Sequence, residues 1–117
     1  MSKQRPTLAN LLVGMAYLAR PLSPYHLLEY SAGANPLFGY SESIALNNLN
    51  AIIHPDDLLA VDYQRQIYIQ NKQPYDLEYR IITQDQQIKY VHDQGQLIEV
   101  HGESFISGFI SDVTNQS

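Results

Sequence analysis

Two neighbouring carboxylates and a histidine are the side chains with which this sequence could do acid–base chemistry. Asp56 and Asp57 stand together in HPDD, and His92 lies in KYVHDQ. A positioned carboxylate or imidazole can act as a general acid or base. However, Asp56 and Asp57 also fit the first turn of a helix that begins at Pro55, and no nucleophile stands at a recognisable spacing from a base. A small stand-alone enzyme, with a cavity acid or base on a cone of curved sheet, is therefore kept as the alternative function.

Cysteine chemistry is excluded, because the chain of 117 residues contains no cysteine. Disulfides, thiolate nucleophiles and zinc–cysteine sites cannot form. The four histidines are His26, His54, His92 and His101, and they show no metal-ligand spacing. We interpret His54 as part of a helix cap, and the sequence predicts no metal site.

The composition indicates one globular domain, with 44% hydrophobic and 16% charged residues. A net charge of −5 and scattered basic residues argue against nucleic-acid binding. The longest apolar runs, such as LLVGMAYLA, are too short to span a membrane, and no secretory signal is recognisable. We expect a cytoplasmic domain that does not contact the membrane.

The hydrophobic pattern predicts an α+β order of elements, with the helices in the middle of the chain. Residues 7–14 predict a short helix, 33–52 several brief helical turns, and Pro55 to Lys72 one long helix. Gly95 predicts a bend or a bulge within its strand. The expected strands are 15–20, 26–32, 75–82, 88–100 and 104–113.

The long helix carries two apolar stripes on nearly opposite sides. Arg65 falls within the first stripe, between apolar residues. The second stripe predicts either partial burial under neighbouring loops or contact with another subunit or domain. The first stripe is Leu58, Val61, Tyr68 and Ile69, and the second is Leu59, Ala60, Tyr63 and Ile67.

Five motifs in order resemble a PAS domain of bacterial sensory proteins, of the PAS fold-3-like subgroup, from about Tyr30 to Thr114. They are GY at 39–40, HPDD at 54–57, EYRI at 78–81, KYVHDQGQLI at 89–98 and GFISDVT at 108–114. The resemblance implies a five-stranded antiparallel sheet of order 2-1-5-4-3, with short helices and one long helix on one face. It implies a helical segment at 1–14, the PAS domain at 15–114 and the start of a linker at 115–117.

The sequence departs from the family pattern at two places. Asp85-Gln86 replaces the common Asp-Gly before the fourth strand, where Tyr90 stands in place of Trp. Asn115-Gln116 stands where an Arg often follows the closing motif. The first difference puts the geometry of the turn in doubt.

The resemblance also implies a ligand cavity beneath the long helix. If the first stripe faces the sheet, Arg65 would point into this cavity beside Tyr79, Tyr90 and His92, with Tyr68 nearby. Its guanidinium could bind a carboxylate or a phosphate, or it could extend to solvent or pair with an acid.

No cofactor is expected, although an unidentified small ligand is compatible with this cavity. Covalent flavin and thioester chromophores need a cysteine, a tryptophan-lined flavin site lacks its tryptophan, and the long helix has no histidine for haem.

The function implied by the resemblance is that of a noncatalytic sensory module. Asp112 and Thr114 would transmit its signal to a C-terminal output domain in the same chain, a diguanylate cyclase ahead of the histidine kinase of a two-component system. The short N-terminal helix cannot be stable alone, so it must pack against the outer face of its own sheet or against the same segment of a second chain. The resemblance implies the second arrangement, and we expect a homodimer. The expected interface is Leu8, Leu11 and Leu12, helped by Tyr63 and Ile67 of the long helix.

Overall fold

The computed structural model describes residues 14–39 and 46–114, which form one sheet and three helical segments. The helical segments all lie between β2 and β3 in the chain, as the sequence predicts. In order, the elements are β1 (Gly14–Ala19), β2 (Leu27–Tyr30), α2 (Ala34–Phe38), the 3₁₀ helix η1 (Leu49–Ile52), α3 (Pro55–Gln70), β3 (Tyr75–Ile82), β4 (Ile88–Val100) and β5 (Glu103–Asp112).

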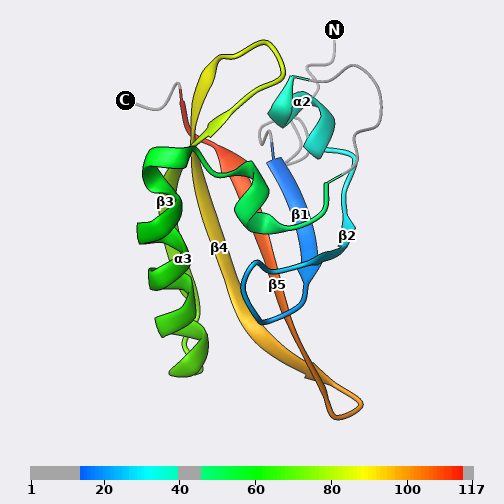
Figure 1. Ribbon diagram of the computed structural model, residues 1–117. Coiled ribbons are helices and arrows are strands. Elements are labelled where there is room, and N and C mark those ends of the chain that lie inside the picture. The colour runs from blue at the N-terminus through cyan, green and yellow to red at the C-terminus, as the bar shows by residue number, and fades with distance from the viewer. Residues whose placement is uncertain (1–13, 40–45, 115–117) are drawn as a thin grey trace, which may run out of the picture.

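The five strands pair antiparallel in the order β2-β1-β5-β4-β3. This confirms the predicted fold and strand order. The long β4–β5 hairpin projects beyond its neighbours to a tip at His101 and Gly102 (Figure 1).

α3 begins where the sequence predicts a helix start. Pro55 occupies the first turn, and His54 Nδ1 accepts a hydrogen bond from the Asp56 N–H at 3.0 Å. Asp56 and Asp57 place negative charge at the positive end of the helix dipole. The interpretation of His54 as a cap residue is confirmed.

The core lies between one face of the sheet and the helical segments (Figure 1). Alternation along β3 turns Tyr75, Leu77, Tyr79 and Ile81 inward, while α3 contributes its first stripe. Within residues 14–39 and 46–114, no helix combines the length and apolar character needed to cross a membrane.

Two local expectations are resolved by the backbone. The bulge predicted at Gly95 is wrong, because the pairing of β4 with β3 and β5 runs through Gly95 without a shift. The turn that lacks Asp-Gly still forms, and Gln86 takes the left-handed conformation, with φ of 67°. The predicted helix at 7–14 lies outside the described residues except for Gly14, which begins β1.

Candidate functional site

Arg65 lies at the centre of the core, with no exposed surface. Its Nη1 is 2.9 Å from Oδ2 of Asp93, which is also fully buried. A charge removed from water needs such a partner, because the desolvation of an unpaired ion is far too costly. Of the alternatives for Arg65, pairing with an acid is the one that the structure shows.

Three tyrosines complete the polar contacts around this ion pair. Asp93 Oδ1 accepts a hydrogen bond from the Tyr17 hydroxyl at 2.6 Å, and Oδ2 accepts one from Tyr79 at 2.8 Å. The hydroxyls of Tyr17 and Tyr75 are 2.5 Å apart. The carboxylate therefore has partners on both oxygens.

The guanidinium of Arg65 also contacts two aromatic rings. Its Cζ lies 5.0 Å from the ring centre of Tyr75 and 5.4 Å from that of Tyr25, within the range of cation–π attraction. Among the residues that the structure describes, Arg65 Nε and Nη2 and the Tyr25 hydroxyl have no hydrogen-bond partner. We name the group formed by Tyr17, Tyr25, Arg65, Tyr75, Tyr79 and Asp93 the buried cluster.

Burial sets the charge states within the buried cluster. Burial raises the pKa of Tyr25 to about 12, and the negative charge of Asp62 adds to this effect. Burial likewise raises the pKa of Tyr75 to about 12, with a further contribution from Asp93. Burial also raises the pKa of Tyr17 and Tyr79 well above the usual value. For Arg65, burial opposes the charge, but Asp93 and the tyrosines hold its pKa well above the usual value. The phenols of the cluster are therefore neutral, and the guanidinium is charged, at neutral pH.

Two glycines make room for this cluster on the sheet. A Cβ atom on Gly95 would lie 2.5 Å from Cζ of Tyr75, and one on Gly108 would lie 2.6 Å from Cζ of Tyr17. The two glycines are paired across β4 and β5. Their lack of side chains allows the phenol rings to approach the backbone closely.

The predicted ligand residues are only partly brought together. Tyr79 belongs to the buried cluster, and Tyr68 is half-buried against the core. The expectation that Tyr90 and His92 lie beside Arg65 is wrong. Strand alternation turns Val91 and Asp93 inward, so Tyr90 and His92 face away from the core.

The positions of the two misplaced residues are clear. Tyr90 is 55% exposed, and the His92 ring contacts the Asp76 carboxylate on the outer face of the sheet. Asp93 was missed although the sequence held a signal for it. The apolar residues Val91 and Leu97 share its side of β4, and this parity places Asp93 inside.

The candidate catalytic residues do not form a site together. Asp57 accepts hydrogen bonds from the Arg80 guanidinium at 2.7 and 3.0 Å, and these bonds lower the pKa of the carboxyl. Asp57 and His92 share no hydrogen bond, and no group of three metal-ligating side chains occurs within the described ranges. Asp57 thus ties the start of α3 to β3.

The end of β5 is fastened to β4 at Tyr90. Tyr90 O accepts a bond from Val113 N at 2.9 Å, and Tyr90 N donates to Thr114 Oγ1 at 3.0 Å. Asp112 Oδ1 accepts from Thr114 N at 2.9 Å, and its Oδ2 lies 3.6 Å from Lys89 Nζ. The direction in which the chain leaves the sheet is therefore held by several bonds.

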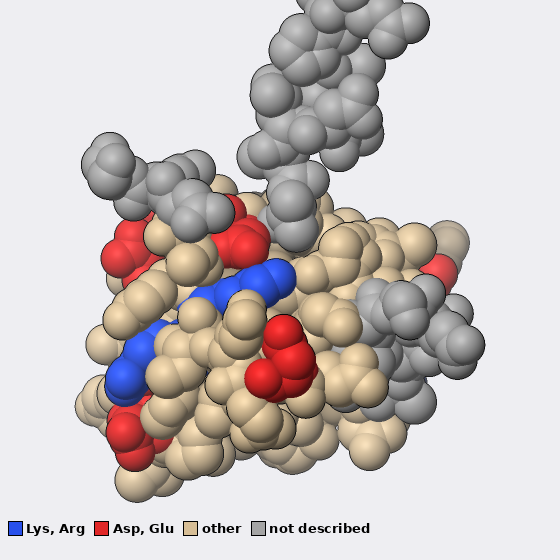
Figure 2. All heavy atoms as spheres, turned by 90° about the horizontal axis from the view of Figure 1, so that it is seen from above, with Lys and Arg blue, Asp and Glu red and all other residues tan. Residues whose placement is uncertain are grey.

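The end of the molecule at which β5 stops carries charges of both signs. Figure 2 shows Lys and Arg side chains there flanked by Asp and Glu side chains. Two ion pairs of the structure join charges of opposite sign, Arg80 with Asp57 at 2.7 Å and Lys89 with Asp112, at the end of β5, at 3.6 Å.

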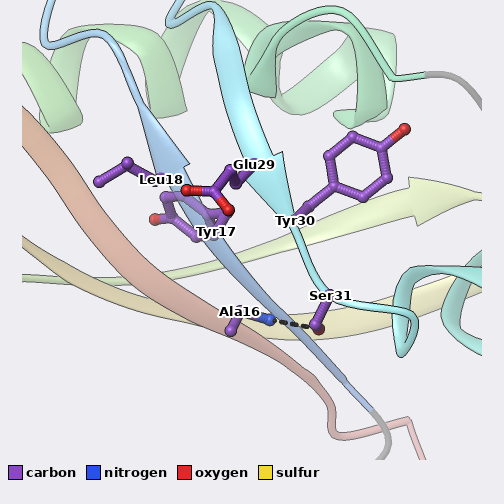
Figure 3. Close-up of a pocket in the computed structure, with 6 residues that line it drawn as sticks. All are labelled: Ala16, Tyr17, Leu18, Glu29, Tyr30 and Ser31. Atoms are coloured by element: carbon purple, nitrogen blue, oxygen red, sulfur yellow. Dashed lines mark hydrogen bonds between the residues drawn. The ribbon is translucent and has the colours of Figure 1, made fainter.

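A shallow pocket of about 310 Å³ lies on β1 and β2. Figure 3 shows Ala16 N bonded to the Ser31 hydroxyl at 3.0 Å, with Leu18 and Glu29 on one side of the strands and Tyr30 pointing to the other. Its connection with the buried cluster is Tyr17, which belongs to both. None of the predicted ligand residues lines this pocket.

The second stripe of α3 is open to solvent. Leu59 is 84% exposed, Tyr63 66% and Ile67 39%. The loops within the described ranges do not cover these side chains, so burial under neighbouring loops does not account for the stripe.

Comparison with known proteins agrees with this architecture. A model of the PAS fold family matches residues 27–110, which is most of the chain. The chain therefore belongs to the PAS family. No curated protein matches its sequence.

Solved PAS structures share the fold at low sequence identity. A sensory box histidine kinase/response regulator from Burkholderia thailandensis E264 has a TM-score of 0.69 and 24% identity, covering 89% of this chain and 79% of its own. The N-terminal domain of a diguanylate cyclase with PAS/PAC sensor from Marinobacter aquaeolei has a TM-score of 0.72 and 14% identity, with coverage of 86% and 95%. A PAS domain from Colwellia psychrerythraea has a TM-score of 0.72 and 16% identity, covering 91% of each chain.

Proposed function

We propose that this domain is a noncatalytic sensory module of a bacterial signalling protein, acting on a C-terminal output domain. The observation that carries the proposal is the connection between the core and the end of β5. Asp93 of the buried cluster stands three positions after Tyr90 on β4, and Tyr90 binds Val113 and Thr114. A shift of β4 at the ion pair would therefore move the end of the sheet.

The output domain that we propose is a diguanylate cyclase, ahead of the histidine kinase of a two-component system. The fold similarity to the N-terminal domain of the Marinobacter diguanylate cyclase and to the Burkholderia kinase supports both choices. A paired output domain requires a homodimer of the sensory module. We place its interface at Leu8, Leu11 and Leu12, with Tyr63 and Ile67 of the exposed second stripe as further contacts.

The signal that we propose is a small anionic ligand bound at Arg65. The guanidinium nitrogens Nε and Nη2 are buried without a partner among the described residues, so both remain as donors for a carboxylate or phosphate. Tyr79 would line this site, with Tyr68 as a further contact from the same helix as Arg65. Tyr90 and His92 are left out of the site because they face the other side of the sheet.

The alternative, a stand-alone enzyme, has less support. Its acid–base candidates lie apart, and Asp57 is held by Arg80. A general base needs a free acceptor within reach of its substrate.

The proposal is tested by the variant Thr114→Val in the full-length protein, with output activity as the readout. Valine keeps the shape of threonine but removes the Oγ1 contact with Tyr90. We expect altered output activity and a nearly unchanged melting temperature of the domain. Ser111→Ala, within β5 just before Thr114, is the matched control: it removes only a long hydrogen bond of 3.5 Å to the His92 carbonyl and should behave as the wild type. Equal activity of Thr114→Val and the wild type would count against transmission through this contact.

A further inference from the structure

The edge strand β3 is only partly covered. At one end, the Arg80 carbonyl accepts a bond from His54 N at 2.8 Å, and the Arg80 N–H donates to Asp57 Oδ2 at 2.9 Å. The segment that leads into α3 therefore closes this end of the strand. An approaching strand could not pair there.

The other end of β3 is open. In an antiparallel pair, every second residue turns its N–H and C=O away from the neighbouring strand. The backbone groups of Arg80 point away from β4, as their bonds to His54 and Asp57 show. Glu78 and Asp76 stand two and four positions before Arg80, so their backbone groups also point outward. No residue within 14–39 and 46–114 forms a backbone hydrogen bond with these outward groups. The edge from Tyr75 to Tyr79 thus presents free donors and acceptors.

A groove of about 560 Å³ runs beside this open edge, between β3 and α3. Figure 1 shows α3 lying alongside β3 at this side of the sheet. Tyr63, Ile67 and Tyr68 form the helix side of the groove, and Leu77 and Asp76 form the strand side. An exposed apolar wall therefore stands next to a row of unpaired backbone groups.

The two faces of the open edge differ in charge. The side chains of Asp76 and Glu78 stand on the outer face, away from α3, and both are exposed. Glu78 forms no ion pair with the described residues. A strand added to this edge would have one row of side chains beside the carboxylates and the other beside the apolar wall.

We propose that this edge and groove bind an extended peptide segment in which basic and apolar residues alternate. The peptide backbone pairs with the outward groups of Asp76 and Glu78, as in recognition by strand addition. Its basic side chains lie beside the two carboxylates, and its apolar side chains lie against Tyr63 and Ile67. Cross-strand pairs of opposite charge stabilise such pairing.

A second copy of the same edge is a poorer occupant. Pairing β3 with β3 would bring Asp76 and Glu78 of both chains onto one face. Like charges placed opposite each other destabilise a sheet. The acidic edge thus discourages self-pairing while it favours a basic partner.

The test uses a fluorescent peptide of sequence Lys-Val-Lys-Leu-Lys-Val-Lys and the full chain of this protein. A second peptide, Lys-Lys-Val-Leu-Val-Lys-Lys, has the same composition but not the alternation. Fluorescence anisotropy should show the alternating peptide binding about tenfold more tightly, because only it places charges and apolar groups on separate faces. Equal binding of the two peptides would overturn the proposal.

Two protein variants locate the site. Glu78→Lys should weaken binding of the alternating peptide by about tenfold, because one attraction becomes a repulsion. Glu99→Lys is the matched control, since Glu99 is also exposed but lies on the projecting hairpin. It should change binding by less than about twofold, because distant exposed charges are screened. An equal loss in both variants would mean that only net charge attracts the peptide.

Amide chemical shifts give an independent readout. Addition of the alternating peptide should move the amide signals of Asp76 and Glu78 more than those of Glu99. Shifts centred elsewhere would refute the site. If the free protein dimerises and dimerisation protects the Asp76 and Glu78 amides from exchange, a second copy occupies the edge and the proposal fails.

Discussion

Gly95 of β4 lies directly opposite Gly108 of β5, and each glycine stands beneath a tyrosine of the buried cluster. Tyr75 approaches Gly95, and Tyr17 approaches Gly108 so closely that an added Cβ atom would overlap either ring. The sheet and the polar core are thus fitted to each other at this pair.

Gly95→Ala should destabilise the domain for this reason. The new methyl group would force Tyr75 away from Tyr17 and disturb the contacts around Asp93. Overpacking of this kind costs about 1–3 kcal/mol of unfolding free energy, measurable by urea denaturation. Ser107→Ala, next to the same pair, is the control and should have a much smaller effect. An unchanged stability of Gly95→Ala would show that the close approach is not rigid.

Removal of one partner of the buried ion pair should be more damaging than removal of both. Arg65→Met leaves the Asp93 carboxylate buried without its cation, which costs about 3–5 kcal/mol. The double variant Arg65→Met, Asp93→Leu removes both charges and should be more stable than the sum of the single losses predicts. A double-mutant cycle in urea measures this coupling. Strictly additive losses would contradict the paired arrangement.

Alkaline pH should unfold the domain through its buried tyrosines. Unfolded tyrosines titrate near pH 10, whereas Tyr25 and Tyr75 titrate at about 12 in the folded state. The folded state therefore binds more protons between these values, and its stability is complete below pH 10 and falls from pH 10 to 12. Unfolding free energies across this range provide the check. Tyr25→Phe should reduce the slope, and a stability independent of pH would conflict with the raised pKa values.

Self-association should depend on the N-terminal leucines. Burial of Leu8, Leu11 and Leu12 contributes about 1.5–3 kcal/mol each before ordering costs, enough for a modest dimer. Sedimentation of the wild type should show a dimer at tens of micromolar, whereas Leu8→Asp, Leu12→Asp should sediment as a folded monomer. Leu22→Asp changes a side chain that is 77% exposed in the β1–β2 loop and serves as the control. If wild type and double variant are both folded monomers, the dimer proposal is wrong.

The fold was predictable because its signals are local or repeated. Alternation over Tyr75–Ile82 and the helix start at Pro55 each depend on neighbouring residues, and the five ordered motifs added the strand order. Helical spacing placed Arg65 within the first stripe, and its inward position followed on the condition that this stripe faces the sheet. Such patterns survive in one sequence because each element must turn one side to the core.

The buried cluster could be predicted only in part, because its contacts join distant segments. Tyr17 and Tyr75 are 58 positions apart, and Tyr17 and Asp93 are 76 apart. Asp93 was not singled out in the sequence, because it stands between the polar residues His92 and Gln94. Only its parity with Val91 on the strand indicates that it faces inward. A glycine within a strand can mark a bulge or make room for a neighbouring group that approaches the backbone closely. From the sequence we predicted the first use for Gly95, whereas the position of Tyr75 shows the second.

The central claim is that this domain senses a signal and passes it to an output domain rather than catalysing a reaction itself. It is tested most directly by product formation from the complete coding sequence, compared with residues 1–117 alone. The account predicts that the complete chain makes a cyclic dinucleotide or phosphorylates its own histidine, and that residues 1–117 turn over no substrate. It would be contradicted by a coding sequence that stops after Ser117, or by turnover in residues 1–117 that Asp57→Asn or His92→Ala abolishes.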